Sequence, residues 1–83
     1  MKAIKQSEAT NYIERLLIER GFSVPSRKLV NQWITFDYQG KQIGIGLAAG
    51  VWVRESESDD WRCFAAPCTV SGAIQAVDFL ANE

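Results

Sequence analysis

The sequence predicts an α+β protein: one small domain over residues 1–83, with a helix, a three- or four-stranded antiparallel β-meander and a second helix. Two segments with helical periodicity, near the two ends of the chain, flank a series of alternating segments between residues 29 and 65. A chain of 83 residues has room for a single hydrophobic core. Because neither helix can bury its apolar stripe alone, both are expected on one face of the sheet.

The first helix is predicted over about residues 7–20, where apolar residues recur at three- and four-residue steps. Ser7 is the expected cap of its first turn, and Gly21 is expected to end it in the left-handed conformation. Phe22 would then pack against Leu17. The expected inner stripe is Ala9, Tyr12, Ile13, Leu16 and Leu17.

Three strands are predicted between residues 29 and 54. Residues 23–28, with Pro25, are expected to be a connector, and residues 29–38 one strand. Gln39-Gly40-Lys41 is typical of a turn and leads into the strand at residues 42–47. Ala48-Ala49-Gly50 predicts a second reversal, into residues 51–54. Alternation places these residues on the core face: Ile34, Phe36, Tyr38, Ile43, Ile45, Leu47, Val51 and Val53.

The last third of the chain predicts a short strand and the closing helix. Residues 55–60 are a solvated acidic reversal, because they lack the ligand spacing of a calcium loop. Residues 61–65 form the expected fourth strand, and Pro67 ends it. The sequence does not decide which of its side chains face the core. Thr69 is the expected cap of a helix with this inner face: Val70, Ala73, Ile74, Val77, Leu80 and Ala81.

The sheet face opposite the helices is the predicted place of function. It is expected to carry Trp33, Thr35, Asp37, Gln42, Gly44, Gly46, Trp52 and Arg54. The bare glycines have two interpretations: an indole ring of Trp33 or Trp52 lies across them, or the backbone of a partner approaches there. A competing prediction, of equal weight, places all three tryptophans in the core, because so short a chain needs large side chains inside.

Catalytic and cofactor chemistry is poorly represented. Histidine is absent, which removes the commonest general base and metal ligand. Cys63 and Cys68 do not suffice for a structural zinc site, and Cys68 is more consistent with a small apolar residue than with a nucleophile. Gly44 and Gly46 lack the remainder of a nucleotide-binding motif. We therefore expect no enzymatic activity, no cofactor, no metal and no small-molecule substrate.

Charge and hydropathy limit the partners and the cellular location that the sequence allows. The net charge is −1, so no overall field attracts polyanions. Residues 43–53, the longest apolar run, are too short to span a bilayer, and residues 1–6 lack the apolar segment of a secretory signal. These observations predict a cytoplasmic location with both thiols reduced and no membrane contact.

The helix–strands–helix order is similar to the topology of double-stranded RNA-binding domains, a resemblance that implies RNA binding. Those domains meet phosphates with lysines at the start of the second helix and with a basic loop. Here the corresponding segment, Thr69-Val70-Ser71-Gly72-Ala73, has no basic residue. RNA binding is therefore the alternative hypothesis, disfavoured by the lack of a basic surface.

The leading hypothesis is a small non-enzymatic protein-binding module, acting as an adaptor, subunit or inhibitor on another protein or on a second copy of itself. Trp and Arg are the residues most enriched among interface anchors. The compact, motif-poor chain is also similar in character to inhibitors encoded by phages and mobile elements. The predicted binding residues are Trp33, Asp37, Gln42, Gly44, Gly46, Trp52, Arg54 and Trp61.

Overall fold

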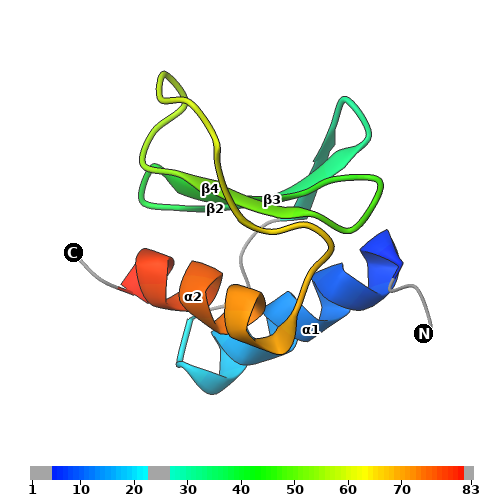
Figure 1. The fold of residues 1–83 in the computed structure, drawn as a ribbon. Coiled ribbons are helices and arrows are strands. Elements are labelled where there is room, and N and C mark those ends of the chain that lie inside the picture. The colour runs from blue at the N-terminus through cyan, green and yellow to red at the C-terminus, as the bar shows by residue number, and fades with distance from the viewer. Residues whose placement is uncertain (1–4, 23–26, 82–83) are drawn as a thin grey trace.

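A computed structural model describes residues 5–22 and 27–81, which fold into a sheet layer and a helix layer (Figure 1). Both helices lie against the same face of the sheet, and the five strands follow chain order, each antiparallel to its neighbour. The predicted fold class is confirmed, with one strand more than expected. The elements are α1 (Gln6–Glu19), β1 (Arg27–Val30), β2 (Trp33–Tyr38), β3 (Lys41–Ile45), β4 (Val51–Arg54), β5 (Arg62–Ala65) and α2 (Val70–Ala81).

The additional strand is β1, which the sequence analysis divided between a connector and the start of the next strand. Val30 pairs with Trp33, and the two residues between them, Asn31 and Gln32, have positive φ values of 51° and 68°. Positive φ at both central positions is typical of a two-residue hairpin turn. Asn31 was the only cue in the sequence, because glutamine is not a usual turn residue. The rest of the predicted connector, residues 23–26, lies outside the described residues.

Helix α1 ends as predicted but begins differently. Gly21 has φ +88°, and the Phe22 backbone N–H donates to the Leu17 carbonyl at 3.0 Å, which is the expected Schellman cap. At the other end the N-cap residue is Lys5, which makes no capping bond with its side chain, so the prediction of a Ser7 cap is wrong. Ala9, Ile13 and Leu17 are buried as the periodicity predicts.

The core lies between the helices and the sheet, and two residues predicted on its strand side, Ile34 and Leu47, do not belong to it. Strand β3 ends at Ile45, and the Ala49 N–H donates to the Gly46 carbonyl at 2.9 Å to close a turn. Leu47 is therefore in a reversal rather than in a strand, and its side chain is 64% exposed. The alternation rule fails there because it holds only while the backbone stays extended.

Helix α2 is capped as predicted but is rotated relative to the expected stripe. The Gly72 N–H donates to Thr69 Oγ1 at 3.0 Å, which confirms the cap. Val70, Ile74 and Ala81, all predicted to face inward, are exposed instead. The inner face consists of Gly72, Ala73, Ala76, Val77 and Leu80. Gly72 permits a close approach of α2 to β5, because a Cβ at this position would overlap the Ala65 methyl group.

Strand β5 has one side on the helix layer. Phe64 packs edge-to-face on Phe79 of α2 with ring centroids 6.1 Å apart, and the Arg62 guanidinium lies 5.3 Å from the same ring. Trp61, just before the strand, contacts Trp33 on the opposite face of the sheet. Pairing between β4 and β5 shifts register between Val51 and Trp52. Contacts with α2 and with β2 therefore decide which side chains of this segment face the helices, a point that the sequence left open.

Replacing Gly72 by alanine tests the close packing of α2. Helix propensity alone would make Gly72→Ala stabilising by about 1 kcal/mol. A Cβ at this position, however, would lie closer to the Ala65 methyl group of β5 than two carbon atoms can approach. We expect urea unfolding to show a loss of about 1–3 kcal/mol from overpacking. Gln75→Ala, an exposed position of the same helix, is the control and should be neutral or slightly stabilising; equal stability of the two variants would contradict this packing.

Candidate functional site

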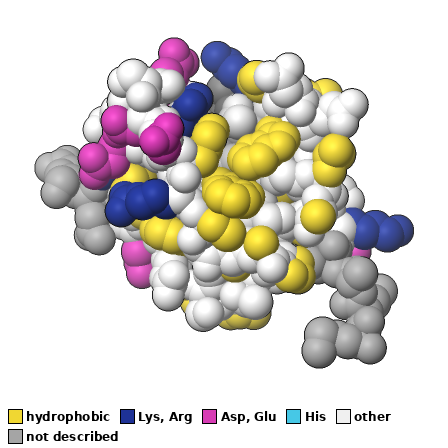
Figure 2. All heavy atoms as spheres, turned by 45° about the horizontal axis from the view of Figure 1, so that its top comes forward, with side chains coloured by type: hydrophobic (Ala, Val, Ile, Leu, Met, Phe, Trp, Pro, Cys, Tyr) yellow, Lys and Arg dark blue, Asp and Glu magenta, His cyan; other side chains and the backbone are white. Residues whose placement is uncertain are grey.

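The face of the sheet that turns away from the helices carries all the predicted site residues. Figure 2 shows hydrophobic side chains gathered in the middle of this side of the molecule, with acidic side chains gathered beside them. Strand pairing adds two residues that the sequence analysis missed, because Lys28 pairs with Thr35 and Val30 pairs with Trp33. We call this surface the tryptophan face; it consists of Lys28, Val30, Trp33, Thr35, Asp37, Gln42, Gly44, Gly46, Trp52, Arg54 and Trp61.

The tryptophan face is built around the indole of Trp33. Its ring centroid lies 5.8 Å from that of Trp52 and 5.7 Å from that of Trp61, with interplanar angles of 43° and 47°. Such tilted contacts are favourable for aromatic rings. The three rings come from β2, from β4 and from the residue before β5, so the cluster links strands that are not adjacent. None of the three belongs to the buried core, and each ring is half-buried, so the prediction that all three are core residues is wrong.

The bare glycines of β3 and the turn after it provide the floor on which Trp33 lies. A Cβ built at Gly44 would come within 2.9 Å of Cε3 of Trp33 and 3.1 Å of Cη2 of Trp61. A Cβ at Gly46 would be 3.5 Å from Trp33, which is ordinary contact. The interpretation of a ring across the glycines is therefore confirmed, and the ring is Trp33. Trp52 approaches Gly50 instead.

A chain of polar side chains crosses β2, β3 and β4 next to the rings. Gln42, almost fully buried, donates from Nε2 to Oδ2 of Asp37 at 3.1 Å and accepts at Oε1 from Nε of Arg54 at 2.6 Å. The Arg54 Nη1 donates to the Glu57 carbonyl at 3.1 Å, and the guanidinium lies 4.2 Å from the Trp61 ring centroid. These bonds hold Arg54 in one orientation over the indole.

Two shallow hollows flank Trp33, each of about 480 Å³. The first, which we call the polar hollow, is lined by Lys28, Val30, Asn31, Trp33, Thr35, Asp37, Gln42, Arg54, Glu57 and Trp61. The second, the apolar hollow, is lined by Trp33, Gly46, Leu47, Ala48, Gly50, Trp52, Ala66 and Pro67. The same indole therefore separates a charged compartment from an aliphatic one.

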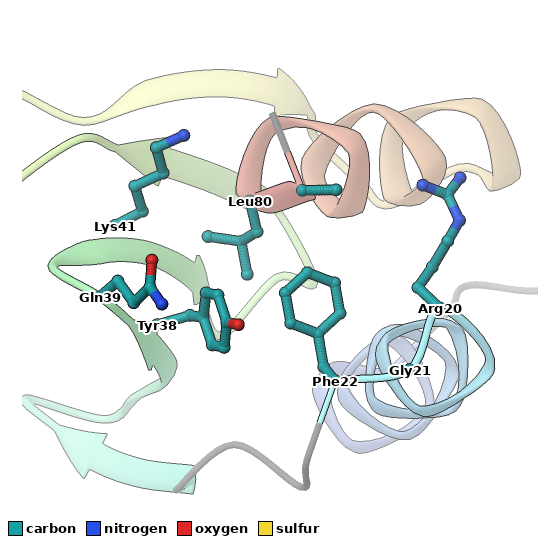
Figure 3. A pocket seen from close by; sticks show the side chains of 8 residues that line it. Arg20, Gly21, Phe22, Tyr38, Gln39, Lys41 and Leu80 are labelled. Carbon is teal, nitrogen blue, oxygen red and sulfur yellow. The ribbon is translucent and has the colours of Figure 1, made fainter. Parts of the chain in front are cut away.

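A third hollow of about 480 Å³ lies at the other side of the molecule, between the ends of the helices and the β2–β3 hairpin (Figure 3). Its ring contact joins Phe22 and Tyr38, whose centroids are 4.6 Å apart. Its charged groups are already engaged: Arg20 forms an ion pair with Asp78, and Lys41 donates to the Phe79 carbonyl. We interpret this hollow as the open end of the core.

The two thiols differ in environment. Cys63 is exposed, whereas Cys68 is buried beneath the start of α2, and burial raises the pKa of the Cys68 thiol. A raised pKa disfavours the thiolate that nucleophilic catalysis requires. Within residues 5–22 and 27–81, no three His, Cys, Asp or Glu side chains are arranged to hold a metal ion.

Protein-family models, curated proteins and solved structures yield no significant match to this chain. In the part of the chain that the structure describes, no helix combines the length and apolarity needed to cross a membrane.

Substitutions at two neighbouring glycines test the packing of Trp33. Gly44→Ala should push the indole rings outward, because the new methyl group would overlap Trp33 and Trp61. We expect a red shift of tryptophan emission, faster acrylamide quenching and a loss of about 1–3 kcal/mol in unfolding free energy. Gly46→Ala, where the methyl group has ordinary contacts, should change all three much less. Equal effects of the two substitutions would argue against this geometry.

Alkylation by iodoacetamide tests the different environments of the thiols. In the folded protein we expect the exposed Cys63 to react readily and Cys68 to react slowly, because burial shields the Cys68 thiol and raises its pKa. Mass spectrometry of peptides from wild type and Cys63→Ser would assign each site, and denaturant should abolish the protection of Cys68. Rapid alkylation of Cys68 in the folded Cys63→Ser variant would instead indicate an activated thiolate.

Proposed function

We propose that the protein is a small non-enzymatic binding module whose partner, another protein, docks on the tryptophan face. The observation that carries the proposal is the cluster of three half-buried indoles on a sheet face that the two helices leave uncovered. Tryptophan supplies a large rigid contact area, and it is the residue type most typical of interface anchors, together with arginine and tyrosine. The module acts as an adaptor, subunit or inhibitor in the cytoplasm.

The fixed arrangement of the face supports this proposal. Arg54 is held by Gln42, by the Glu57 carbonyl and by the Trp61 ring before any partner arrives. Trp33 is likewise held against Gly44 and Gly46. Side chains that are already ordered lose less conformational entropy on association, which favours affinity. Asp37 and Lys28 supply the polar rim that gives such interfaces their specificity.

Two alternatives use the same surface. Self-association requires only that the tryptophan face be complementary to itself about a two-fold axis. RNA binding, which the resemblance in topology implies, would use the rings as stacking platforms for bases. The charges argue against RNA, because α2 contains Asp78 and no basic residue, and the β4–β5 loop is acidic.

Truncation of Trp52 tests the proposal. Trp52 is the ring least involved in the packing on Gly44, so Trp52→Ala should leave the fold intact. In affinity capture from the cells that encode the protein, we expect a partner protein that wild type retains and Trp52→Ala loses. With that partner purified, the substitution should weaken binding by about 2 kcal/mol, or roughly thirtyfold in Kd.

The matched control is Ile18→Ala, which removes an exposed aliphatic side chain from α1, on the opposite side of the molecule. This variant should bind the partner like wild type. If Trp52→Ala and wild type capture the partner equally, the tryptophan face is not the docking surface. If both variants lose it while remaining folded by circular dichroism, the docking surface extends to the helix layer and the proposal as stated fails.

A further inference from the structure

We infer that the partner segment on the tryptophan face carries a cationic Arg or Lys side chain for the polar hollow and an aliphatic side chain for the apolar hollow. This inference rests on the proposed function and adds the chemistry of the partner to it. Three features support it: the local charge, the ring beside that charge, and the division of the face by Trp33.

The surroundings of the polar hollow are acidic because the β4–β5 loop lies beside it, although the whole chain carries only −1. The β4–β5 loop exposes four carboxylates, and none of them forms an ion pair with another described residue. Asp37 contributes a fifth. Lys28 and Arg54 line the polar hollow with Asp37 and Glu57, whereas Arg62 lines a neighbouring hollow with Arg54 and the other three loop carboxylates. These five carboxylates and three cations leave a local net charge of −2. Arg62 lies on the helix side over Phe79. The loop carboxylates are Glu55, Glu57, Asp59 and Asp60.

The positive charge of Arg54 is already in use. Its guanidinium is stacked on Trp61 and bonded to the Gln42 side chain and to the Glu57 carbonyl. That arrangement shows inside the molecule how an indole and oxygen acceptors hold a cation on this face. The half-buried Trp33 ring lies next to Trp61 and also borders the polar hollow, so it offers a second indole surface beside the Asp37 carboxylate. An incoming guanidinium or ammonium group fits this combination better than a phosphate or a carboxylate, because Arg54 is already engaged and Lys28 is the other cation in the lining.

The apolar hollow is the reason for the aliphatic side chain in the inferred partner segment. Its lining of Leu47, Ala48, Ala66 and Pro67 has no charged side chain, and Leu47 is largely exposed at its border. Because both hollows share the Trp33 ring as a wall, one extended segment can fill both with alternate side chains. The smallest such segment has a cationic residue and an aliphatic residue two positions apart.

Three N-acetylated, C-amidated peptides test the inference: Ala-Arg-Ala-Leu-Ala and its counterparts with Gln or Glu in place of Arg. The readout is the indole N–H resonances of the three tryptophans, assigned with Trp33→Phe, Trp52→Phe and Trp61→Phe. We expect the Arg peptide at millimolar concentration to shift the resonances of Trp33, Trp52 and Trp61. The Gln peptide should bind roughly tenfold more weakly at low salt, and about 0.5 M salt should remove most of this difference by screening. The Glu peptide should produce no shift.

Neutralisation of the loop provides the matched variants. The quadruple variant E55Q/E57Q/D59N/D60N should reduce the affinity for the Arg peptide to about that for the Gln peptide. The control E8Q/E19Q, with two exposed carboxylates removed from α1, should bind like wild type. Because all six positions are exposed, the variants should remain folded.

Four results would overturn the inference. These are equal shifts with the Arg and Glu peptides, no shift with the Arg peptide at several millimolar, shifts that follow protein concentration without any peptide, and the same shifts with a single-stranded RNA oligonucleotide. The third would assign the face to a second copy, and the fourth to nucleic acid. The proposed function can stand when this inference fails. If a captured partner depends on Trp52 but binds the neutralised variant as tightly as wild type, in low and in high salt, the protein-binding function stands and the cationic partner is ruled out.

Discussion

The structure depends on one constraint, which is that a sheet has two faces and this chain has helices for only one of them. Both helices pack on the side that carries Phe36, Ile43 and Val53. The other side is covered by its own side chains, with the Trp33 ring spread over Gly44 and Gly46. Glycine is necessary at least at Gly44, where any side chain would occupy the volume of the ring. The rings shield the sheet from water, yet they stay half exposed.

This arrangement links stability and function on the same surface. The contacts that hold Trp33, Trp52 and Trp61 together remove part of each ring from water, which stabilises the fold. The part that remains exposed is rigid and apolar, and it is bordered by a fixed polar chain through Gln42. A surface of this kind differs from a scattered set of exposed hydrophobic residues, which needs no functional explanation. Its acidic border then restricts the class of partner that it can attract.

The parts of the fold that the sequence predicted are those decided by short-range geometry. The Schellman cap at Gly21 and the Thr69 cap depend on residues within one helical turn, and both were found where expected. Predictions failed where the backbone left its regular path, where a whole element could rotate, and at the start of α1, which begins before the predicted Ser7 cap. Leu47 lies outside the core because the chain turns at Gly46. Strand β1 was not predicted because Gln32 has a positive φ, which is unusual for glutamine.

The sequence by itself determined which residues of β2, β3 and β4 point away from the helices, and hence seven of the eleven residues of the tryptophan face, because successive side chains of an extended backbone alternate. Only the tertiary structure decided that Trp33, rather than Trp52, lies on the glycines, and that Trp61 joins the cluster from beyond β4. Those outcomes depend on which strands are neighbours, since β3 lies between β2 and β4, and β5 pairs with β4. Contacts between segments distant in the chain set both, and no local pattern encodes them.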